Sequence, residues 1–132
     1  SENVSTNEVA EILNSFEHVN MANVYGVKVP KSEGRAGMVA FNCNLDEFNW
    51  DDFSSFVIDK LPSYAQPIFV RIIEELETTG TFKLKKNDLR EEAYHLDKVN
   101  GNLVFIKKPG QNTYVPLDRD FYEVIESGQA GF

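Results

Sequence analysis

The chain contains a single cysteine, Cys43, and this scarcity excludes two kinds of stabilisation. One thiol can form no disulfide within the chain, and it cannot supply the several sulfur ligands of a cysteine-based metal site. Cys43 stands in an apolar, alternating stretch, where a free cysteine is usually buried and inert. We therefore expect neither a disulfide framework nor a nucleophilic cysteine.

Long hydrophobic runs and histidine pairs are also missing. No stretch approaches the roughly eighteen consecutive apolar residues of a membrane-spanning helix, and the polar, acidic amino terminus is unlike a signal peptide. The two histidines, His18 and His95, do not have a metal-ligand spacing such as i, i+4. We expect no membrane span in this segment, no metal site and a cytoplasmic location.

Basic residues are fewer than acidic ones, 13 against 21, and the net charge is −8. The overall field therefore repels nucleic acids, and we expect no nucleic-acid partner. A phosphate group could bind only at a local exception to this field. With 132 residues, of which 42% are hydrophobic, the chain is long and apolar enough for one ordinary folded domain.

Hydrophobic periodicity predicts a small α+β domain with a three-stranded sheet, flanking helices and the element order α-β-β-α-β. We expect a core of residues 1–95 and an extension of residues 96–132, which forms a hairpin and a helix packed on the same domain and ends in a frayed tail. The expected elements of the core are a helix from the capping box Ser5–Glu8, strands over 19–29 and 38–43, a helix from about Asn49 to Leu61, a strand over 68–73 and a helix over 87–95. The expected elements of the extension are hairpin strands within 99–106 and 113–116, with turns at Asn100-Gly101 and Pro109-Gly110, and a helix over 118–125.

Two loops contain residues that suit chemistry. Gly34 and Gly37 permit positive φ or a close approach of backbone, although glycine between two strands most often only makes a turn. Lys83, Lys86 and Arg90 form a basic cluster at a predicted helix start, where cations oppose the helix dipole, so helix stability does not explain them. Neighbouring acidic residues can neutralise this cluster, and residue chemistry alone leaves a solvated helix start as an alternative.

The segment from Thr79 to Leu89, Thr-Gly-Thr-Phe-Lys-Leu-Lys-Lys-Asn-Asp-Leu, resembles the last core motif of the adenylate-forming superfamily of acyl-CoA synthetases, luciferases and nonribosomal-peptide adenylation domains. Lys83 falls on the motif's lysine, and Lys86 replaces its usual arginine. The form Gly-Thr-Phe-Lys is typical of the fatty-acid-transport-protein branch. Further matches in family order are Glu2-Asn-Val-Ser5, Val24-Tyr-Gly-Val with Pro30, Glu33-Gly-Arg-Ala-Gly-Met38, Leu61-Pro-Ser-Tyr-Ala with Pro67, and Tyr114-Val-Pro-Leu117.

This resemblance implies the carboxy-terminal lid domain of an AMP-forming ligase for long or very long fatty acids. Such an enzyme uses ATP and Mg²⁺ to make an acyl-adenylate and then transfers the acyl group to coenzyme A. The partner would be the enzyme's own large amino-terminal domain, which is absent from this chain. That domain could also place the enzyme on the cytosolic face of a membrane. The chain alone is expected to be inactive and to hold no ligand tightly.

The resemblance also implies roles for individual residues. Lys83 would be the catalytic lysine of adenylation, because a cation brought in by a closing lid offsets the repulsion between two joining anions. The residues expected to support this loop are Thr79, Gly80, Thr81 and Lys86. The expected face for transfer to coenzyme A comprises Glu2, Asn3, Val4, Gly34, Arg35 and Gly37.

A second hypothesis needs no catalysis. The same element order with a glycine loop is compatible with a ferredoxin-like regulatory module that binds a small molecule. Such a module has no requirement for a lysine loop, so the role of Lys83 separates the two hypotheses.

Overall fold

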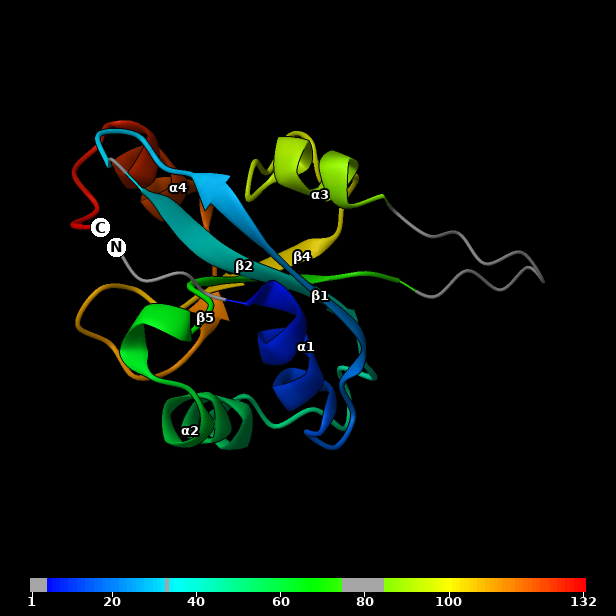
Figure 1. Ribbon diagram of the computed structural model, residues 1–132. Coiled ribbons are helices and arrows are strands. Elements are labelled where there is room, and N and C mark those ends of the chain that lie inside the picture. Colours follow the sequence, from blue (N-terminus) through cyan, green and yellow to red (C-terminus); the bar gives the residue numbers. More distant parts are fainter. Residues whose placement is uncertain (1–4, 33, 75–84) are drawn as a thin grey trace.

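Helices cover both faces of a five-stranded mixed sheet in the computed structural model (Figure 1), which describes residues 5–32, 34–74 and 85–132. The strand order is β1-β2-β3-β4-β5; β2 and β3 run parallel, and the other neighbouring pairs run antiparallel. The elements are α1 (Thr6–Asn14), β1 (Asn20–Lys28), β2 (Arg35–Asn42), α2 (Trp50–Lys60), a 3₁₀ turn (Ser63–Ala65), β3 (Phe69–Ile72), α3 (Lys86–Glu92), β4 (Leu103–Ile106), β5 (Val115–Pro116) and α4 (Arg119–Glu126).

The sheet separates two hydrophobic cores. Helices α1 and α2 lie on one side of it, and α3 and α4 lie on the other (Figure 1). Successive side chains of a strand point to opposite faces, so Val70 packs in the core under α1 and α2, while Phe69 packs in the core under α3 and α4. Burial on both faces explains why residues 68–73 read as a nearly continuous apolar run.

Local capping starts three of the helices where the sequence predicts them. Ser5, Asn49 and Asp118 accept hydrogen bonds from the backbone N–H groups of Glu8, Asp52 and Phe121, at 3.3, 2.9 and 2.8 Å. Each cap satisfies a backbone donor that the first helical turn leaves without a partner. Helix α2 ends at Lys60, just before Leu61 and the helix-breaking Pro62.

The α+β class is confirmed, but the predicted three-stranded sheet is too small. β4 pairs with β3, for example Val70 with Phe105, and β5 pairs with β4. The expected hairpin is therefore β4 with β5, around the turn that contains Gly110. The turn at Asn100 and Gly101, both with positive φ, lies before the hairpin and leads into β4. Local patterns could not show this pairing because β3 and β4 are far apart in the chain.

The predicted frayed tail is wrong, because the residues after α4 pack against the sheet. The ring of Phe132 lies 5.9 Å from that of Phe69, and Ala130 also contacts this core. Burial of an aromatic ring offsets the entropy of ordering a chain end. Cys43 is half-buried, and burial raises its pKa to about 11, which agrees with an inert thiol.

None of the helices in the described ranges combines the length and the apolar character needed to cross a membrane.

Candidate functional site

Seven of the predicted site residues lie outside the described residues: Glu2, Asn3, Val4, Thr79, Gly80, Thr81 and Lys83. Their predicted roles therefore remain predictions. Gly34, Arg35, Gly37 and Lys86 are described. They lie on the connection into β2, on β2 itself and at the first residue of α3.

Gly37 lies beside the loop before β3, where a Cβ atom would make ordinary van der Waals contacts. A Cβ atom at this position would lie 3.4 Å from Cα of Pro67 and 3.8 Å from the carbonyl oxygen of Gln66. The N–H of Ile68 donates to the carbonyl oxygen of Gly37 at 2.9 Å, and Nζ of Lys107 donates to Oε1 of Gln66 at 2.7 Å. The loop before β3 is thus held over β2. Gly34 has open space around it.

Arg35 lies across the neighbouring strand. It is the first residue of β2 and pairs with Lys28 of β1. A Cβ atom at Gly26, in the middle of β1, would lie 3.1 Å from both Cβ and Cδ of Arg35. Glycine in a strand interior weakens the strand, but here its missing side chain leaves room for the stem of Arg35. The local sequence therefore orients this arginine.

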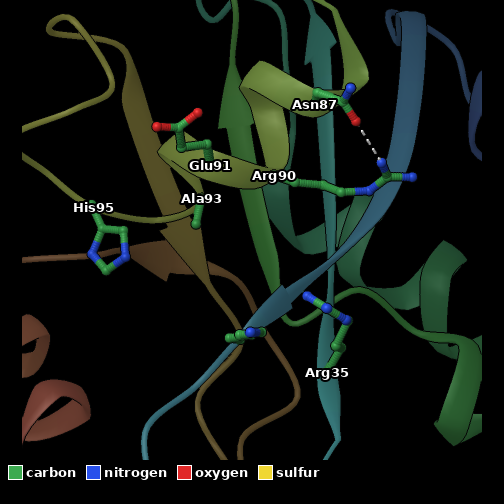
Figure 2. A pocket seen from close by; sticks show the side chains of 7 residues that line it. Arg35, Asn87, Arg90, Glu91, Ala93 and His95 are labelled. Atoms are coloured by element: carbon green, nitrogen blue, oxygen red, sulfur yellow. Dashed lines mark hydrogen bonds between the residues drawn. The ribbon is translucent and has the colours of Figure 1, made fainter.

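Helix α3 adds a third cation beside Lys28 and Arg35. Nη1 of Arg90 donates to Oδ1 of Asn87 at 3.0 Å, which holds the guanidinium near the β1 edge (Figure 2). An open hollow of about 380 Å³ lies here, and its lining residues are Lys28, Arg35, Asn87, Arg90, Glu91, Ala93 and His95 (Figure 2).

The charges of this hollow differ from those of the whole chain. Lys28, Arg35 and Arg90 contribute three cations and Glu91 one carboxylate, whereas the chain carries a net charge of −8. Guanidinium groups bind phosphate and carboxylate through two parallel N–H donors. The hollow is therefore suited to an anionic group. It is the local exception to the acidic field that phosphate binding requires.

Lys86 connects two other parts of the predicted site. Its Nζ donates to Oγ1 of Thr6 at 3.2 Å, which joins the first turn of α3 to the first turn of α1. Residues 1–4 precede α1, and residues 75–84 precede α3. Thr6 follows the predicted transfer-face residues 2–4, and Lys86 follows the predicted catalytic Lys83. One hydrogen bond therefore connects the described neighbours of these two predicted sites. An ammonium group has three donors, so this bond leaves Lys86 able to contact an anion.

His95, on the rim of the hollow, is bonded to α4. Its Nδ1 lies 2.8 Å from Oη of Tyr122 and 3.1 Å from Oε1 of Glu126. Burial and a hydrogen bond to Glu126 raise the pKa of Tyr122 to about 12, so its hydroxyl stays protonated at neutral pH. These contacts hold the imidazole of His95 against α4.

Sequence reasoning did not predict that Lys28, Asn87 and Glu91 line the same hollow as Arg35. The predicted strand over 38–43 begins too late, because β2 starts at Arg35 and pairs this residue with Lys28. Nothing local indicated that α3 would lie against this strand pair. Among the described residues, no three His, Cys, Asp or Glu side chains are grouped as a metal site requires.

Sequence comparisons find close relatives over nearly the whole chain, although no family model matches. Long-chain fatty acid transport protein 6 of Mus musculus is 43% identical over 130 residues, which are 96% of this chain and 20% of that protein. The medium/long-chain-fatty-acid–CoA ligase FadD6 of Mycobacterium tuberculosis is 37% identical over 129 residues, 97% of this chain and 21% of the ligase. The chain thus spans about a fifth of the length of these relatives.

Solved structures share the fold. Mycobacterium tuberculosis fatty acyl CoA synthetase superposes with a TM-score of 0.57 at 23% identity, covering 70% of this chain and 18% of that one. Coronafacic acid ligase from Pectobacterium brasiliense superposes with a TM-score of 0.60 at 21% identity, covering 78% of this chain and 19% of that one. These two matches show a shared fold. The chain belongs to the fatty acid transport protein family of acyl-CoA synthetases, and it corresponds to their carboxy-terminal domain.

Proposed function

We propose that this chain is the mobile lid domain of an AMP-forming fatty acid:CoA ligase. The observation that carries the proposal is the similarity along 96% of the chain to a fatty acid transport protein of which it spans only 20%. A domain of this size then works with a larger amino-terminal partner that binds ATP, Mg²⁺ and the fatty acid. Residues 1–95 would form the lid core and residues 96–132 the family-specific extension.

In this proposal Lys83 serves the adenylation step. That step joins a carboxylate to the α-phosphate of ATP and breaks the bond to the β-phosphate, which releases pyrophosphate. Two anions must therefore approach each other, and negative charge develops on the oxygens around the α-phosphorus. A lysine brought in by the lid offsets both effects without proton transfer. Thr79, Gly80, Thr81 and Lys86 would support its loop, and Lys86 would do so from the start of α3.

The cationic hollow serves the second step. Coenzyme A carries phosphate groups, and Arg35 and Arg90 are each oriented by a neighbour, Gly26 and Asn87 respectively. Two arginines placed in advance lose little side-chain entropy when they bind an anion. Gly34, Gly37 and residues 2–4 would complete the transfer face. This chemistry favours a ligase domain over a ferredoxin-like sensor.

The remaining parts of the proposal concern the isolated chain. It would be inactive and would bind ATP and coenzyme A only weakly, because their pockets lie mostly in the larger domain. The whole enzyme would work in the cytoplasm or at the cytosolic face of a membrane, where its long-chain substrates are available.

The test measures the two half-reactions separately in the full-length protein. Lys83→Ala is expected to slow adenylate formation, measured by pyrophosphate exchange, about 10²–10³-fold, as loss of one preorganised donor does. Lys85→Ala removes the same charge from the same basic run and should leave the rate nearly unchanged. Normal exchange in Lys83→Ala would refute the role of Lys83.

The complementary variant is Arg35→Ala, with transfer measured from preformed acyl-adenylate to coenzyme A. We expect a KM for coenzyme A about tenfold higher, which corresponds to ~1.4 kcal/mol, with little change in pyrophosphate exchange. Arg119→Ala is the matched control, because Arg119 is exposed, is paired with Asp97 and does not line the hollow. Equal losses in both half-reactions would contradict the assignment of this face.

A further inference from the structure

Arg71 is an unusual residue to find in the middle of β3. It is the largest fully buried side chain of the described residues, with 1% of its surface exposed. Its Nη1 donates to Oε1 of Glu92 at 2.7 Å, its Nε to Oδ1 of Asn102 at 3.0 Å, and its Nη2 to the carbonyl oxygen of Val99 at 3.3 Å. Every nitrogen of the guanidinium therefore has a partner.

Fold stability does not explain this arrangement. Transfer of an ion pair into a protein interior costs several kcal/mol per ion before attraction offsets it, and replacement of such a pair by apolar side chains of similar volume is often neutral or stabilising. The strand around Arg71 is wholly apolar, so an apolar residue would suit this position. A buried arginine with directed hydrogen bonds instead determines geometry.

The partners of Arg71 show which geometry is determined. β3 ends at Ile72 and leads toward residues 75–84, the segment that contains Lys83. α3 begins at Lys86, directly after this segment, and Glu92 is its last residue. The ion pair thus joins the strand before the segment to the helix after it.

Helix α3 depends on such contacts for its orientation. It has only seven residues, and isolated helices of this length are marginal in water. At its end Ala93 adopts a positive φ of 46°, so the chain turns away immediately after Glu92. Leu89 anchors the helix in the core, and Lys86 and Glu92 bond at its two ends to Thr6 and Arg71. Loss of the bond at Glu92 would free the last turn of α3, so the helix could change its angle to β3.

We propose that Arg71 and Glu92 are positioning residues for the adenylation step. Their ion pair holds β3 and α3 at a fixed separation and angle, and this places the two ends of the segment that contains Lys83. The inference rests on the proposed role of Lys83 and extends it to two residues that act through the backbone. They touch neither ATP nor the fatty acid.

The main test uses the full-length ligase with the double change Arg71→Met and Glu92→Leu, which removes both charges and leaves neither ion unpaired. Misplacement of a catalytic group by about 1 Å can cost about 10²-fold in rate. We expect pyrophosphate exchange at saturating ATP and fatty acid to fall by roughly 10–10²-fold. The rate of acyl transfer from preformed acyl-adenylate to coenzyme A should stay within about twofold. Thermal unfolding should stay close to the wild-type temperature, because the loss of one donor to Asn102 is offset by the removal of both ions.

A double-mutant comparison distinguishes positioning from a merely structural role. In a Lys83→Ala background, the double change should slow exchange little further, because groups that act as a unit give non-additive effects. An unchanged exchange rate in the double variant, equal loss of both half-reactions, or a full additional loss in the Lys83→Ala background would each overturn the inference.

A second variant gives the same test if the double change prevents folding. Arg71→Lys keeps the charge but loses the planar fork, so it cannot bond Glu92, Asn102 and Val99 together. We expect exchange several-fold slower than wild type with normal acyl transfer, and wild-type exchange would overturn the inference. The proposed function fails separately, through normal exchange in Lys83→Ala alone.

Discussion

The two faces of the sheet are buried by different chemistry. Under α1 and α2, aromatic rings pack at an angle against Phe53, with centroid distances of 5.3 Å to Phe48 and 5.4 Å to Phe16. Nearby, the ring of Trp50 stacks on that of Phe105 at 3.9 Å. We call this the aromatic face. Two buried hydroxyl groups of this face have partners: that of Ser54 bonds to Trp50 and Tyr114, and that of Tyr114 bonds to Pro67.

The opposite side, under α3 and α4, is the polar face. It contains the Arg71–Glu92 ion pair, and the hydroxyl groups of Tyr25 and Tyr94 are buried there without a partner among the described residues. An unpaired buried hydroxyl costs free energy, whereas aromatic packing stabilises. The difference indicates that the aromatic face supplies stability, and that the polar face accepts a cost to place α3 and the hollow beside it.

The largest expected effect is on the aromatic face. Phe53→Ala removes a fully buried ring from contact with five other aromatic side chains and should lower the free energy of unfolding by about 3–5 kcal/mol. Urea denaturation of the chain measures this change. Ile58→Ala, in the same helix but 41% exposed, should cost much less. A small effect of Phe53→Ala would remove the basis for assigning stability to this face.

A smaller effect compares one hydroxyl from each face. The hydroxyl of Tyr114 donates to the carbonyl oxygen of Pro67, so Tyr114→Phe leaves a buried acceptor unpaired and should cost about 1–3 kcal/mol. Tyr94→Phe removes a hydroxyl without a partner among the described residues and should be neutral or stabilising. Urea denaturation compares the two variants directly. Equal destabilisation by both would mean that buried hydroxyl groups on the two faces do not differ in their hydrogen bonding.

A third effect appears at high pH. Burial raises the pKa of Tyr25 and Tyr94 on the polar face and of Tyr114 on the aromatic face. A raised folded-state pKa means that the unfolded chain loses its protons first, so stability is complete below about pH 10 and falls as the pH rises above it. Urea denaturation between pH 8 and 11, with tyrosinate absorbance as a second probe, follows this loss. Full ionisation of these tyrosines near pH 10 in the folded chain would contradict their burial.

Local signals in the sequence predicted much of the fold. The caps at Ser5, Asn49 and Asp118 involve residues only three positions apart, so composition and spacing indicate them directly. The strands were visible because alternating or continuous apolar runs follow from burial of one or both faces. The placement of β4 beside β3 was not visible, since pairing between distant strands depends on the whole core.

The candidate site divides in the same way. Family resemblance singled out Arg35, Lys86 and the lysine loop, and the basic residues stood out against the acidic composition. No local pattern indicated that Arg35 and Arg90 border one hollow, or that Lys86 bonds to Thr6. These contacts join segments far apart in the chain. They depend on the direction in which α3 packs.

By itself, the sequence determined the family, the helix starts, the absence of a disulfide framework and the lysine motif, because each depends on residue types at short spacing. Only the tertiary structure decided that Lys28, Arg35 and Arg90 converge, and that Arg71 bonds to Glu92 inside the polar face. The physical reason is that strand register and helix packing minimise the free energy of the whole core. The position of a distant charge follows from that minimum and not from its neighbours in the chain.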